Sequence, residues 1–471
     1  MRLGALTGGS QAEAVTGFAI DHRKVAPGTV FGAFAGARFN GEDFIPAAVE
    51  SGAVAIVAAR HARVRGALHI ADDQPRARFA QLAAKFFAPF PQTAVAVTGT
   101  NGKTSTVEMT RQLWRMAGRH AASIGTLGVT TADERAATGL TTPDIVTFLS
   151  NVAGLAREGV THVAFEASSH GLDQYRTEGL PVAAAAFTNL SRDHLDYHGT
   201  MEAYLAAKLR LFSEVLTPGG AAVVWADDPS SARVIEVARG RGATVLTVGE
   251  RGDMLRLVDR TPTLLGQAVV IEADGVVHKV NLPLIGAYQA ANALMAAGLV
   301  IATGGEVKAT LQALGRLQPV RGRLERAVIT KAGAPVYVDY AHTPDALEAA
   351  VAALKPHAAG KLILVFGAGG DRDQGKRSEM GVVAGEQADR VIVTDDNPRS
   401  EDPAAIRRMV LGGAPDAVEI GDRREAIAAA IGEAGPADIV LVAGKGHEQG
   451  QVVGDLVLPF DDVAVARESA R

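Results

Sequence analysis

The chain has 471 residues, 47% hydrophobic and 21% charged, a typical globular composition and a length that suits about three domains. Its net charge of −5 argues against nucleic acid as a partner, because binding phosphate backbones takes an excess of Lys and Arg. The absence of Cys excludes disulfides, zinc-thiolate sites, iron–sulfur clusters and Cys nucleophiles, and it fits a reducing cytoplasm. Apolar runs fall well short of the ~18 residues that span a bilayer, and no signal peptide follows Met1. We therefore expect a cytoplasmic protein without a membrane or nucleic-acid partner.

The first two predicted blocks cover residues 1–90 and 91–318. In the first, strands are predicted at 30–33 and 53–57 and helices at 44–51 and 77–87, and Phe90-Pro91 then breaks the chain. In the second, strands are predicted at 93–97, 163–166, 183–188 and 221–225, with a helix over 201–212. Residues 317–319 form the next candidate linker.

The third block, residues 319–471, alternates most regularly. Strands are predicted at 336–339, 362–366, 390–394 and 439–442, and helices at 345–354, 404–409 and 423–431. Such alternation predicts α/β domains with mainly parallel sheets, and the third block resembles a Rossmann-like open sheet. Ligands bind such sheets at the carboxyl ends of the strands, where segments 367–373, 395–399 and 444–448 fall.

Residues 98–105 (TGTNGKTS) lie between a predicted strand and a helix, as a phosphate-binding loop does. Glycines let backbone N–H groups approach phosphate, and a helix N-terminus adds partial positive charge. Lys103 can reach the β- and γ-phosphates, and a hydroxyl of the next two residues can bind Mg²⁺. Val97 stands where the common loop has its first Gly, so a Gly-rich turn with a surface Lys is the alternative. The ATP-binding candidates in this loop are Gly99, Thr100, Asn101, Gly102, Lys103, Thr104 and Ser105.

This shortened loop and the order of the three blocks resemble the Mur ligase family, ATP-dependent amide-forming enzymes of peptidoglycan precursor synthesis, and their folylpolyglutamate synthetase relatives. The resemblance implies a UDP-substrate domain over 1–90, a central ATPase domain over 91–318 and a Rossmann-like amino-acid-binding domain over 319–471. It also implies ATP contacts by Asn292, Arg323 and Asp339. Taken one by one, these three could be a helix cap, a surface charge and a strand end.

Glu166 and His194 each stand at or after the end of a predicted strand, and Lys208 lies on the helix predicted at 201–212. Mg²⁺ prefers oxygen ligands, which makes Glu166 a natural candidate. Without further context, His194 would be a hydrogen-bonded side chain and Lys208 a solvated one. The resemblance implies that Lys208 is carbamylated, which turns a cation into a carboxylate. It further implies that Thr104, Glu166, His194 and Lys208 hold Mg²⁺, and that Lys103 joins the last three in catalysis.

Two groups of residues resemble the family's UDP-muramoyl dipeptide site. Ile20, His22 and the segment 36–41 (GARFNG) match uridine- and pyrophosphate-binding segments, although many relatives have Ser in place of His22 and plain turns are the alternative. Further along, hydroxyl, amide and guanidinium groups suit a carboxylate-bearing substrate. The implied dipeptide contacts are Thr141, Thr142, Ser168, Gln174 and Arg176, the two threonines being equally explained as caps or turns.

Residues 395–401 (DDNPRSE) resemble the D-N-P-R sequence of the members that add meso-diaminopimelate. Diaminopimelate carries a distal carboxylate and ammonium, whereas lysine has only the ammonium, and an Arg fork matches a carboxylate with two hydrogen bonds. Glu448 can accept the ammonium. A Pro turn with a surface Arg is the alternative. The implied contacts are Arg372, Asp396, Asn397, Pro398, Arg399, Gly444 and Glu448.

The resemblance implies a monomeric enzyme that joins meso-diaminopimelate to UDP-N-acetylmuramoyl-L-alanyl-D-glutamate through an acyl phosphate, with ATP and Mg²⁺ as cofactors. Its domains are expected to close on binding. The base for the amine proton is left open, with His342 as a candidate. A folylpolyglutamate synthetase would not need the UDP block or the D-N-P-R sequence. A nucleotide-binding regulator without turnover would not need Glu166, His194 and Lys208 together.

Overall fold

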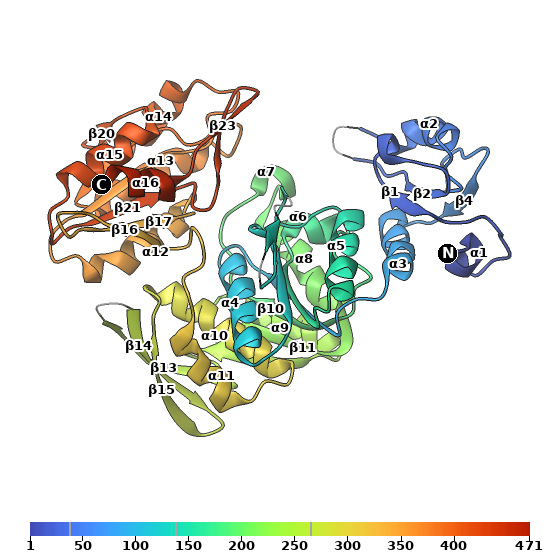
Figure 1. Cartoon of the computed structure of the whole chain (residues 1–471), viewed down its shortest axis with the longest axis horizontal. Coiled ribbons are helices and arrows are strands. Elements are labelled where there is room, and N and C mark those ends of the chain that lie inside the picture. The colour runs from blue at the N-terminus through green and yellow to red at the C-terminus, as the bar shows by residue number, and fades with distance from the viewer. Residues whose placement is uncertain (37–38, 133, 137–138, 264–265) are drawn as a thin grey trace.

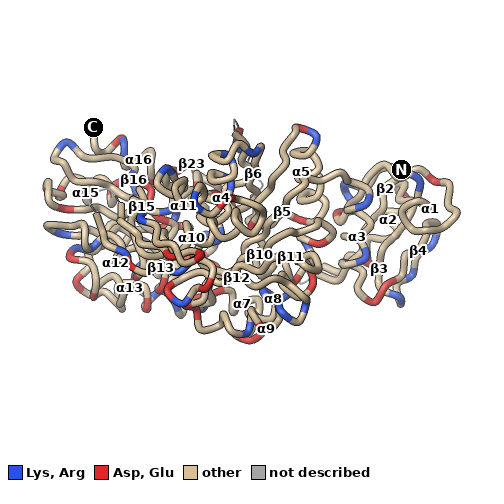
Figure 2. The backbone as a smooth tube through the Cα atoms, turned by 90° about the horizontal axis from the view of Figure 1, so that it is seen from below, with Lys and Arg blue, Asp and Glu red and all other residues tan. Residues whose placement is uncertain are grey.

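The computed structural model describes residues 1–36, 39–132, 134–136, 139–263 and 266–471. Three α/β units lie in a row, with the N-terminal unit at one end and the C-terminal unit at the other (Figure 1). Charged residues of both signs are spread along all three (Figure 2). Residues 37 and 38 of the segment 36–41 lie outside the described residues. Within the described residues, no helix has the length and hydropathy needed to cross a membrane.

The N-terminal unit is a four-stranded parallel sheet in the order β1-β2-β3-β4. The predicted strands and helices of the first block are present, with small shifts at their ends. Its elements are α1 (Leu3–Thr7), β1 (Gly17–Ala19), η1 (His22–Lys24), β2 (Thr29–Gly32), η2 (Gly41–Phe44), α2 (Ile45–Glu50), β3 (Ala55–Ala58), β4 (Leu68–Ala71) and α3 (Pro75–Phe87).

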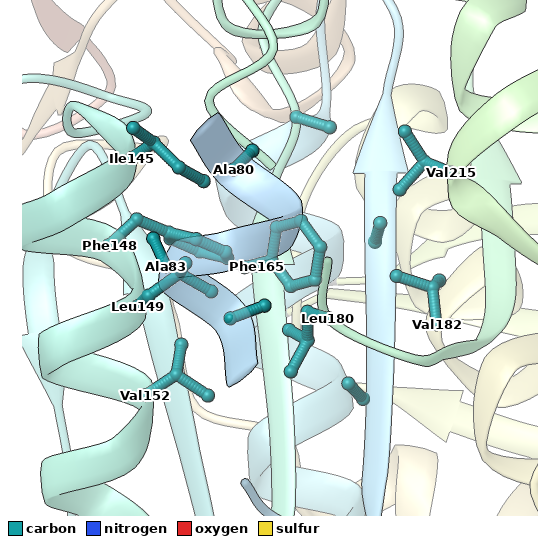
Figure 3. Close-up of a cluster of buried hydrophobic side chains, with 14 of the residues drawn as sticks. Ala80, Ala83, Ile145, Phe148, Leu149, Val152, Phe165, Leu180, Val182 and Val215 are labelled. Atoms are coloured by element: carbon teal, nitrogen blue, oxygen red, sulfur yellow. The ribbon is translucent and has the colours of Figure 1, made fainter. Parts of the chain in front are cut away.

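Helix α3 joins this unit to the next. Its buried Ala80 and Ala83 pack against α5 (Ile145–Arg157), beside Phe148 and Phe165 of the central unit (Figure 3). The two rings meet edge to face with centroids 5.0 Å apart. Because small alanines let the helices approach closely, one apolar cluster runs continuously through both units.

The central unit is built on an eleven-stranded sheet in the order β15-β14-β13-β12-β11-β10-β5-β9-β6-β7-β8. The middle strands are parallel and buried on both faces, which explains alternation-free apolar runs such as that of β5. Its strands are β5 (Thr93–Thr98), β6 (Ala121–Gly125), β7 (Gly128–Thr130), β8 (Arg135–Ala136), β9 (His162–Glu166), β10 (Val182–Phe187), β11 (Leu216–Trp225), β12 (Thr244–Gly249), β13 (Leu255–Thr263), β14 (Gly266–Ala273) and β15 (Val276–Leu282).

Helices cover both faces of this sheet. One face carries α4, α10 and α11, and the other carries α3, α5 and α9. The helix predicted over 201–212 is α8, which ends at Arg210 and continues as a π-helical turn, η3. The helices are α4 (Lys103–Met116), α6 (Ser169–Asp173), α7 (Leu195–His198), α8 (Met201–Arg210), η3 (Leu211–Val215), α9 (Ser231–Gly240), α10 (Ala287–Ala302), α11 (Val307–Ala313) and η4 (Leu314–Arg316).

The C-terminal unit is an open sheet in the order β16-β17-β21-β18-β19-β20, parallel except for β16. Helices α12 to α14 cover one face, and α15 and α16 cover the other. The elements are β16 (Glu325–Ile329), β17 (Pro335–Asp339), α12 (Pro344–Leu354), η5 (Lys355–His357), β18 (Leu362–Phe366), α13 (Gly375–Gln387), β19 (Arg390–Val393), α14 (Pro403–Leu411), β20 (Val418–Glu419), α15 (Arg423–Glu433), β21 (Ile439–Ala443), β22 (Gly450–Val453), β23 (Leu456–Pro459) and α16 (Asp462–Ser469).

Candidate active site

The phosphate-binding loop follows β5 and opens α4, as the sequence predicts. Gly99 and Gly102 both have positive φ, 145° and 84°. A Cβ on Gly99 would lie 1.9 Å from Thr188 Oγ1, and one on Gly102 would lie 2.3 Å from Asn292 Oδ1. Only glycine therefore fits either position.

The segment after β10 braces this loop from the side. The Asn101 backbone N–H donates to Asn189 Oδ1 at 2.8 Å, and the Asn101 carbonyl accepts from Thr188 Oγ1 at 2.6 Å. The Thr100 backbone N–H donates to the Asn189 carbonyl. Hydrogen bonds from the end of β10 thus fix the conformation of the loop.

The half-buried Lys103 and the buried Lys208 share one acceptor at this loop. Lys103 Nζ donates to the carbonyls of Gly99 and Thr100 at 2.9 and 2.7 Å, and Lys208 Nζ donates to the Gly99 carbonyl at 2.7 Å. Burial lowers the pKa of Lys103. Burial also lowers the pKa of Lys208, and repulsion from the positive charge of Lys103 lowers it further. The alternative of a solvated Lys208 does not hold, since the residue is 1% exposed and its Nζ lies 4.2 Å from the Tyr204 ring centroid.

Glu166 and His194 face the same cavity as the two lysines. Glu166 is 2% exposed and accepts the Thr126 backbone N–H at 2.7 Å, and burial raises the pKa of its carboxyl. His194 stands at the N-cap of α7 with φ 54° and lies 3.4 Å from Asp193. The His194 side chain is 44% exposed, but partial desolvation lowers its pKa to about 4, and the neutral imidazole can offer a lone pair.

The protein side chains near the phosphate loop supply only part of the oxygen ligands that Mg²⁺ prefers. No three His, Asp or Glu side chains of the described residues gather closely enough to hold a metal ion. One cavity of about 150 Å³, called the phosphate-loop cavity below, is nevertheless lined by Thr104, Glu166, His194 and Lys208. These supply a hydroxyl, a carboxyl, an imidazole and an amine whose pKa burial lowers. Carbamylation of Lys208 and the phosphate oxygens of a nucleotide would complete an oxygen-rich set.

The remaining ATP candidates line a second cavity of about 190 Å³ between the central and C-terminal units. Asn292 on α10 and Asp339 at the end of β17 both face it. Asp339 accepts backbone N–H groups from Leu324 at 2.7 Å and Ala341 at 2.8 Å. Arg323 lines this cavity as well as the phosphate-loop cavity, and its Nη2 donates to Thr104 Oγ1 at 3.1 Å. Ser105 also lines this second cavity.

The predicted dipeptide contacts divide into two groups. Thr141 and Ser168 line the phosphate-loop cavity. Thr142 does not, and its hydroxyl donates to the Glu166 carbonyl at 2.9 Å while accepting the Ser168 N–H at 3.0 Å. The structural role that the sequence left open for Thr142 is therefore observed.

Gln174 and Arg176 lie together beyond α6. Arg176 donates to Gln174 Oε1 at 2.6 Å and to the Thr142 carbonyl at 3.0 Å. Arg76, which the sequence did not single out, donates to the Ala35 carbonyl and lies 4.9 Å over the Phe34 ring. Burial lowers the pKa of Arg76, and the charge of Arg176 lowers it further. Two such guanidinium groups on adjoining units suit an anionic substrate.

Ile20 and His22 lie on the surface of the N-terminal unit, outside these cavities. Ile20 is 37% exposed at the end of β1. His22 lies in η1, and its ring stacks on Phe44 with centroids 4.3 Å apart and planes 4° apart. A flat aromatic surface of this kind can support a nucleobase.

A third cavity, of about 320 Å³, lies at the carboxyl ends of the C-terminal strands and is called the C-terminal cavity below. Of the seven diaminopimelate candidates, Pro398 is not among its lining residues. The other six line it, namely Arg372, Asp396, Asn397, Arg399, Gly444 and Glu448. Asp396 is 8% exposed, and its Oδ2 is buried without a hydrogen-bond partner in the described residues. Cations and carboxylates here face one space, as a zwitterionic amino acid requires.

Arg399 is held in a strained conformation at this cavity. Its φ is 52°, unusual for a residue with a side chain. Its Nη1 donates to the Gly370 carbonyl at 2.6 Å and its backbone N–H to the Val452 carbonyl at 3.0 Å. The surrounding contacts therefore aim the guanidinium, and the proposed surface-Arg alternative does not describe it.

The three cavities meet at Tyr340 and His342, which line all of them. The carbonyl of Tyr340 can only accept, so the 2.8 Å contact with His342 Nδ1 places a proton on Nδ1 and leaves Nε2 free to accept one. Burial lowers the pKa of His342. Asp193, a lining residue of two cavities that the sequence did not single out, could have been noticed as the neighbour of His194.

A family model matches each of the three units. The model described as Mur ligase family, catalytic domain, matches residues 14–87, Mur ligase middle domain matches 97–300, and Mur ligase, glutamate ligase domain, matches 322–446.

Two relatives cover nearly the entire chain. The UDP-N-acetylmuramoyl-L-alanyl-D-glutamate–2,6-diaminopimelate ligase of Zymomonas mobilis subsp. mobilis is 60% identical over 97% of this chain and 94% of its own. The protein of the same name from Bradyrhizobium diazoefficiens is 52% identical over 95% of this chain and 93% of its own.

A solved structure of a UDP-N-acetylmuramoyl-L-alanyl-D-glutamate–2,6-diaminopimelate ligase is also similar. It is 32% identical, covers 100% of this chain and 98% of its own, and superposes with a TM-score of 0.73. A Mycobacterium tuberculosis folylpolyglutamate synthase complexed with ADP is 20% identical over 82% of this chain and 91% of its own, with a TM-score of 0.64. At that identity the second likeness concerns the fold alone.

Proposed function

This chain belongs to the Mur ligase family, and we propose that it is the ATP-dependent ligase that joins meso-diaminopimelate to UDP-N-acetylmuramoyl-L-alanyl-D-glutamate. The carrying observation is the convergence of three cavities at Tyr340 and His342. One holds the phosphate loop, one lies against Asn292 and Asp339, and one holds Arg399. A nucleotide, the carboxylate of an acyl donor and an amino acid can thus meet at one point.

The chemistry proceeds through an acyl phosphate. The γ-carboxylate of the D-glutamyl residue attacks the γ-phosphorus of ATP, and ADP leaves. The diaminopimelate amine then attacks the acyl carbon, loses a proton and displaces phosphate, which leaves an amide. Lys103 would stabilise the charge that develops on the transferred phosphoryl group. His342, with a free Nε2 beside the C-terminal cavity, is a candidate acceptor for the amine proton.

We propose that Thr104, Glu166, His194 and carbamylated Lys208 hold Mg²⁺. The ion would neutralise charge on the phosphate oxygens and on the attacking and leaving groups. Carbamylation joins Lys208 Nζ to the carbon of CO₂ and releases a proton, which requires a neutral amine. Burial and the nearby Lys103 lower the pKa of Lys208 and so favour that neutral form. The new carboxylate would also replace a like-charge contact with an attractive one.

The two other substrate sites are proposed on the same residues that the sequence indicated. The uridine diphosphate end would bind the N-terminal unit near Ile20 and His22, and its peptide end would reach Thr141, Ser168 and the Gln174–Arg176 pair. In the C-terminal cavity, Arg399 and Arg372 would bind the distal carboxylate of diaminopimelate and Glu448 its ammonium.

We further propose a monomeric cytoplasmic enzyme whose three domains span 1–90, 91–318 and 319–471 and close around the substrates. The phosphate-binding loop lies on the central unit and the amino-acid residues on the C-terminal unit, so closure would bring the reacting atoms together.

The direct test is phosphate release from ATP with UDP-N-acetylmuramoyl-L-alanyl-D-glutamate, comparing meso-diaminopimelate with L-lysine. Release with diaminopimelate alone is expected. Release with lysine instead would contradict the assignment of Arg399, and release with neither would contradict the ligase assignment.

A further inference from the structure

Lys445, which follows β21, has a fully buried side chain that the proposed reaction does not use. Its Nζ donates to Asn397 Oδ1 at 2.9 Å and lies 3.1 Å from Glu448 Oε2. Removing an ammonium group from water is costly unless polar partners replace the water. Both of its partners line the C-terminal cavity, so this buried charge is tied to the ligand site.

The contact with Lys445 sets the orientation of the Asn397 amide. Asn397 Oδ1 also accepts the Val452 backbone N–H at 2.9 Å. An ammonium and a backbone N–H can only donate, so the atom between them must be the amide oxygen. The amide nitrogen is thereby turned toward Glu448, and Asn397 Nδ2 donates to Glu448 Oε2 at 2.8 Å.

Glu448 consequently presents one oxygen to the cavity. Its Oε2 receives both Lys445 Nζ and Asn397 Nδ2. Among the described residues, no hydrogen bond or ion pair is found for Oε1. A carboxylate held by two donors at one oxygen has limited freedom to rotate, and its other oxygen stays available to a ligand cation.

The same strand sets the distance to Arg399. The Val452 N–H bonds to Asn397, and the Val452 carbonyl accepts the Arg399 N–H at 3.0 Å. The Arg399 backbone and, through Asn397, the Glu448 carboxylate are therefore both tied to Val452 of β22. Such a pair matches a carbon that carries both a carboxylate and an ammonium group.

We propose that Lys445 is a positioning residue that makes the C-terminal cavity selective for amino acids with an ammonium beside the distal carboxylate. It acts through Glu448, whose free oxygen it aims at that ammonium, and through Asn397, whose amide it orients. The inference rests on the proposed function, because it concerns the amino acid that the ligase accepts.

The test compares meso-diaminopimelate with 2-aminopimelate, which has the distal carboxylate but no distal ammonium. We expect the wild-type enzyme to prefer diaminopimelate in kcat/KM by about 100-fold, the range for a hydrogen-bonded charge. In Lys445→Met, that preference should fall by about tenfold or more. The loss should lie in KM for diaminopimelate, with KM for ATP, KM for the UDP-dipeptide and kcat/KM for 2-aminopimelate little changed. Lys331→Met, at an exposed lysine of the same unit, is the matched control and should keep the wild-type preference.

Lys445→Gln provides a second variant, since its amide can still donate to both partners, and it should lose less selectivity than Lys445→Met. An unchanged preference in Lys445→Met, or an equal loss with both amino acids, would show that Lys445 serves folding alone. If neither variant folds, the wild-type ratio decides, because equal use of the two amino acids contradicts an aimed ammonium acceptor. Failure of the wild-type enzyme to use diaminopimelate at all would instead contradict the proposed function.

Discussion

The phosphate-loop cavity and the C-terminal cavity both lie at the carboxyl ends of parallel strands, but they hold their cations differently. Among the described residues, the Lys103 and Lys208 ammonium groups bond to main-chain carbonyls and to no carboxylate. In the C-terminal unit, cations outside the cavity lining form close pairs with carboxylates, whereas Arg399 in the lining donates to the Gly370 carbonyl. These pairs are Arg377–Glu401, Arg407–Asp395, Lys445–Glu448 and Arg423–Asp462.

The difference corresponds to what each site must bind. A nucleoside triphosphate is strongly anionic, so a site in which Lys103 bonds to main-chain carbonyls gains the missing counter-charge from the substrate. A zwitterionic amino acid brings almost no net charge. Its site must be neutralised in advance, and geometry rather than net charge then distinguishes one amino acid from another. Substitutions in the two cavities should consequently change different measurable properties of the enzyme.

The largest effect is expected for Lys208→Ala. The variant loses both the proposed carbamate and the metal ligand, so kcat should fall by about 1,000-fold or more. Phosphate release at saturating substrates measures it. Added short carboxylic acids should restore part of the activity, because they can supply the missing carboxylate. Full activity without any additive would contradict the carbamate role.

Asp462→Ala tests the paired character of the C-terminal unit. The variant leaves the guanidinium of Arg423 buried without its two hydrogen bonds of 2.8 and 2.7 Å. The free energy of unfolding should drop by about 3–5 kcal/mol. Denaturant unfolding measures it, with Asp73→Ala at the exposed Arg60 pair as the control, where about 0–1 kcal/mol is expected. Equal losses in the free energy of unfolding would show that the buried pair stabilises the protein no more than the exposed pair.

Arg399→Lys separates geometry from charge. The cation is kept but the planar fork is lost, so KM for diaminopimelate should rise by about 10- to 100-fold while KM for ATP is unchanged. Steady-state kinetics measures both constants. Arg408→Lys, at an exposed residue of the same unit, should behave as the wild type. A parallel rise in KM for ATP would contradict separate sites.

The smallest effect concerns His447, which lacks an anionic partner in an otherwise paired region. Burial, and then the charges of Arg323 and Arg135, lower its pKa to about 3. In the unfolded state His447 therefore takes up a proton near pH 6.5, whereas in the folded state it stays neutral. The free energy of unfolding should fall as pH drops from 7 to 5. Urea unfolding at both pH values should show about 1–2 kcal/mol less pH dependence in His447→Gln. The exposed His61→Gln should keep the wild-type dependence, and no difference between the two variants would contradict the shift.

Much of the parallel architecture could be predicted because local patterns carry it. The apolar run at 93–97 and the turn residues after it indicate a buried strand and a loop whatever the rest of the chain does, and β5 and α4 confirm them. The antiparallel strands β13 to β15 were not predicted. Apolar and polar residues alternate only weakly along these strands. The strands are stabilised by pairing with one another and by packing against α10.

The candidate site divides in the same manner. Residue types near strand ends indicated Lys103 and Glu166 as candidates, the resemblance indicated Arg399, and all three line cavities in the structure. They could not indicate Arg76 or Asp193, because no local pattern distinguishes these from ordinary surface charges. Their importance comes from elements distant in the chain, such as the approach of Arg76 to Arg176 across two units.

The amino-acid sequence by itself determined the α/β class and the order of the units, and it indicated the candidate groups for the chemistry, since spacing and residue type are local properties. Only the tertiary structure decided the state of those groups. It removed Lys208 from water, committed the Thr142 hydroxyl to the backbone and turned one oxygen of Glu448 toward the cavity. Burial and hydrogen-bond partners depend on chain segments far apart in sequence, and those segments meet only in the folded protein.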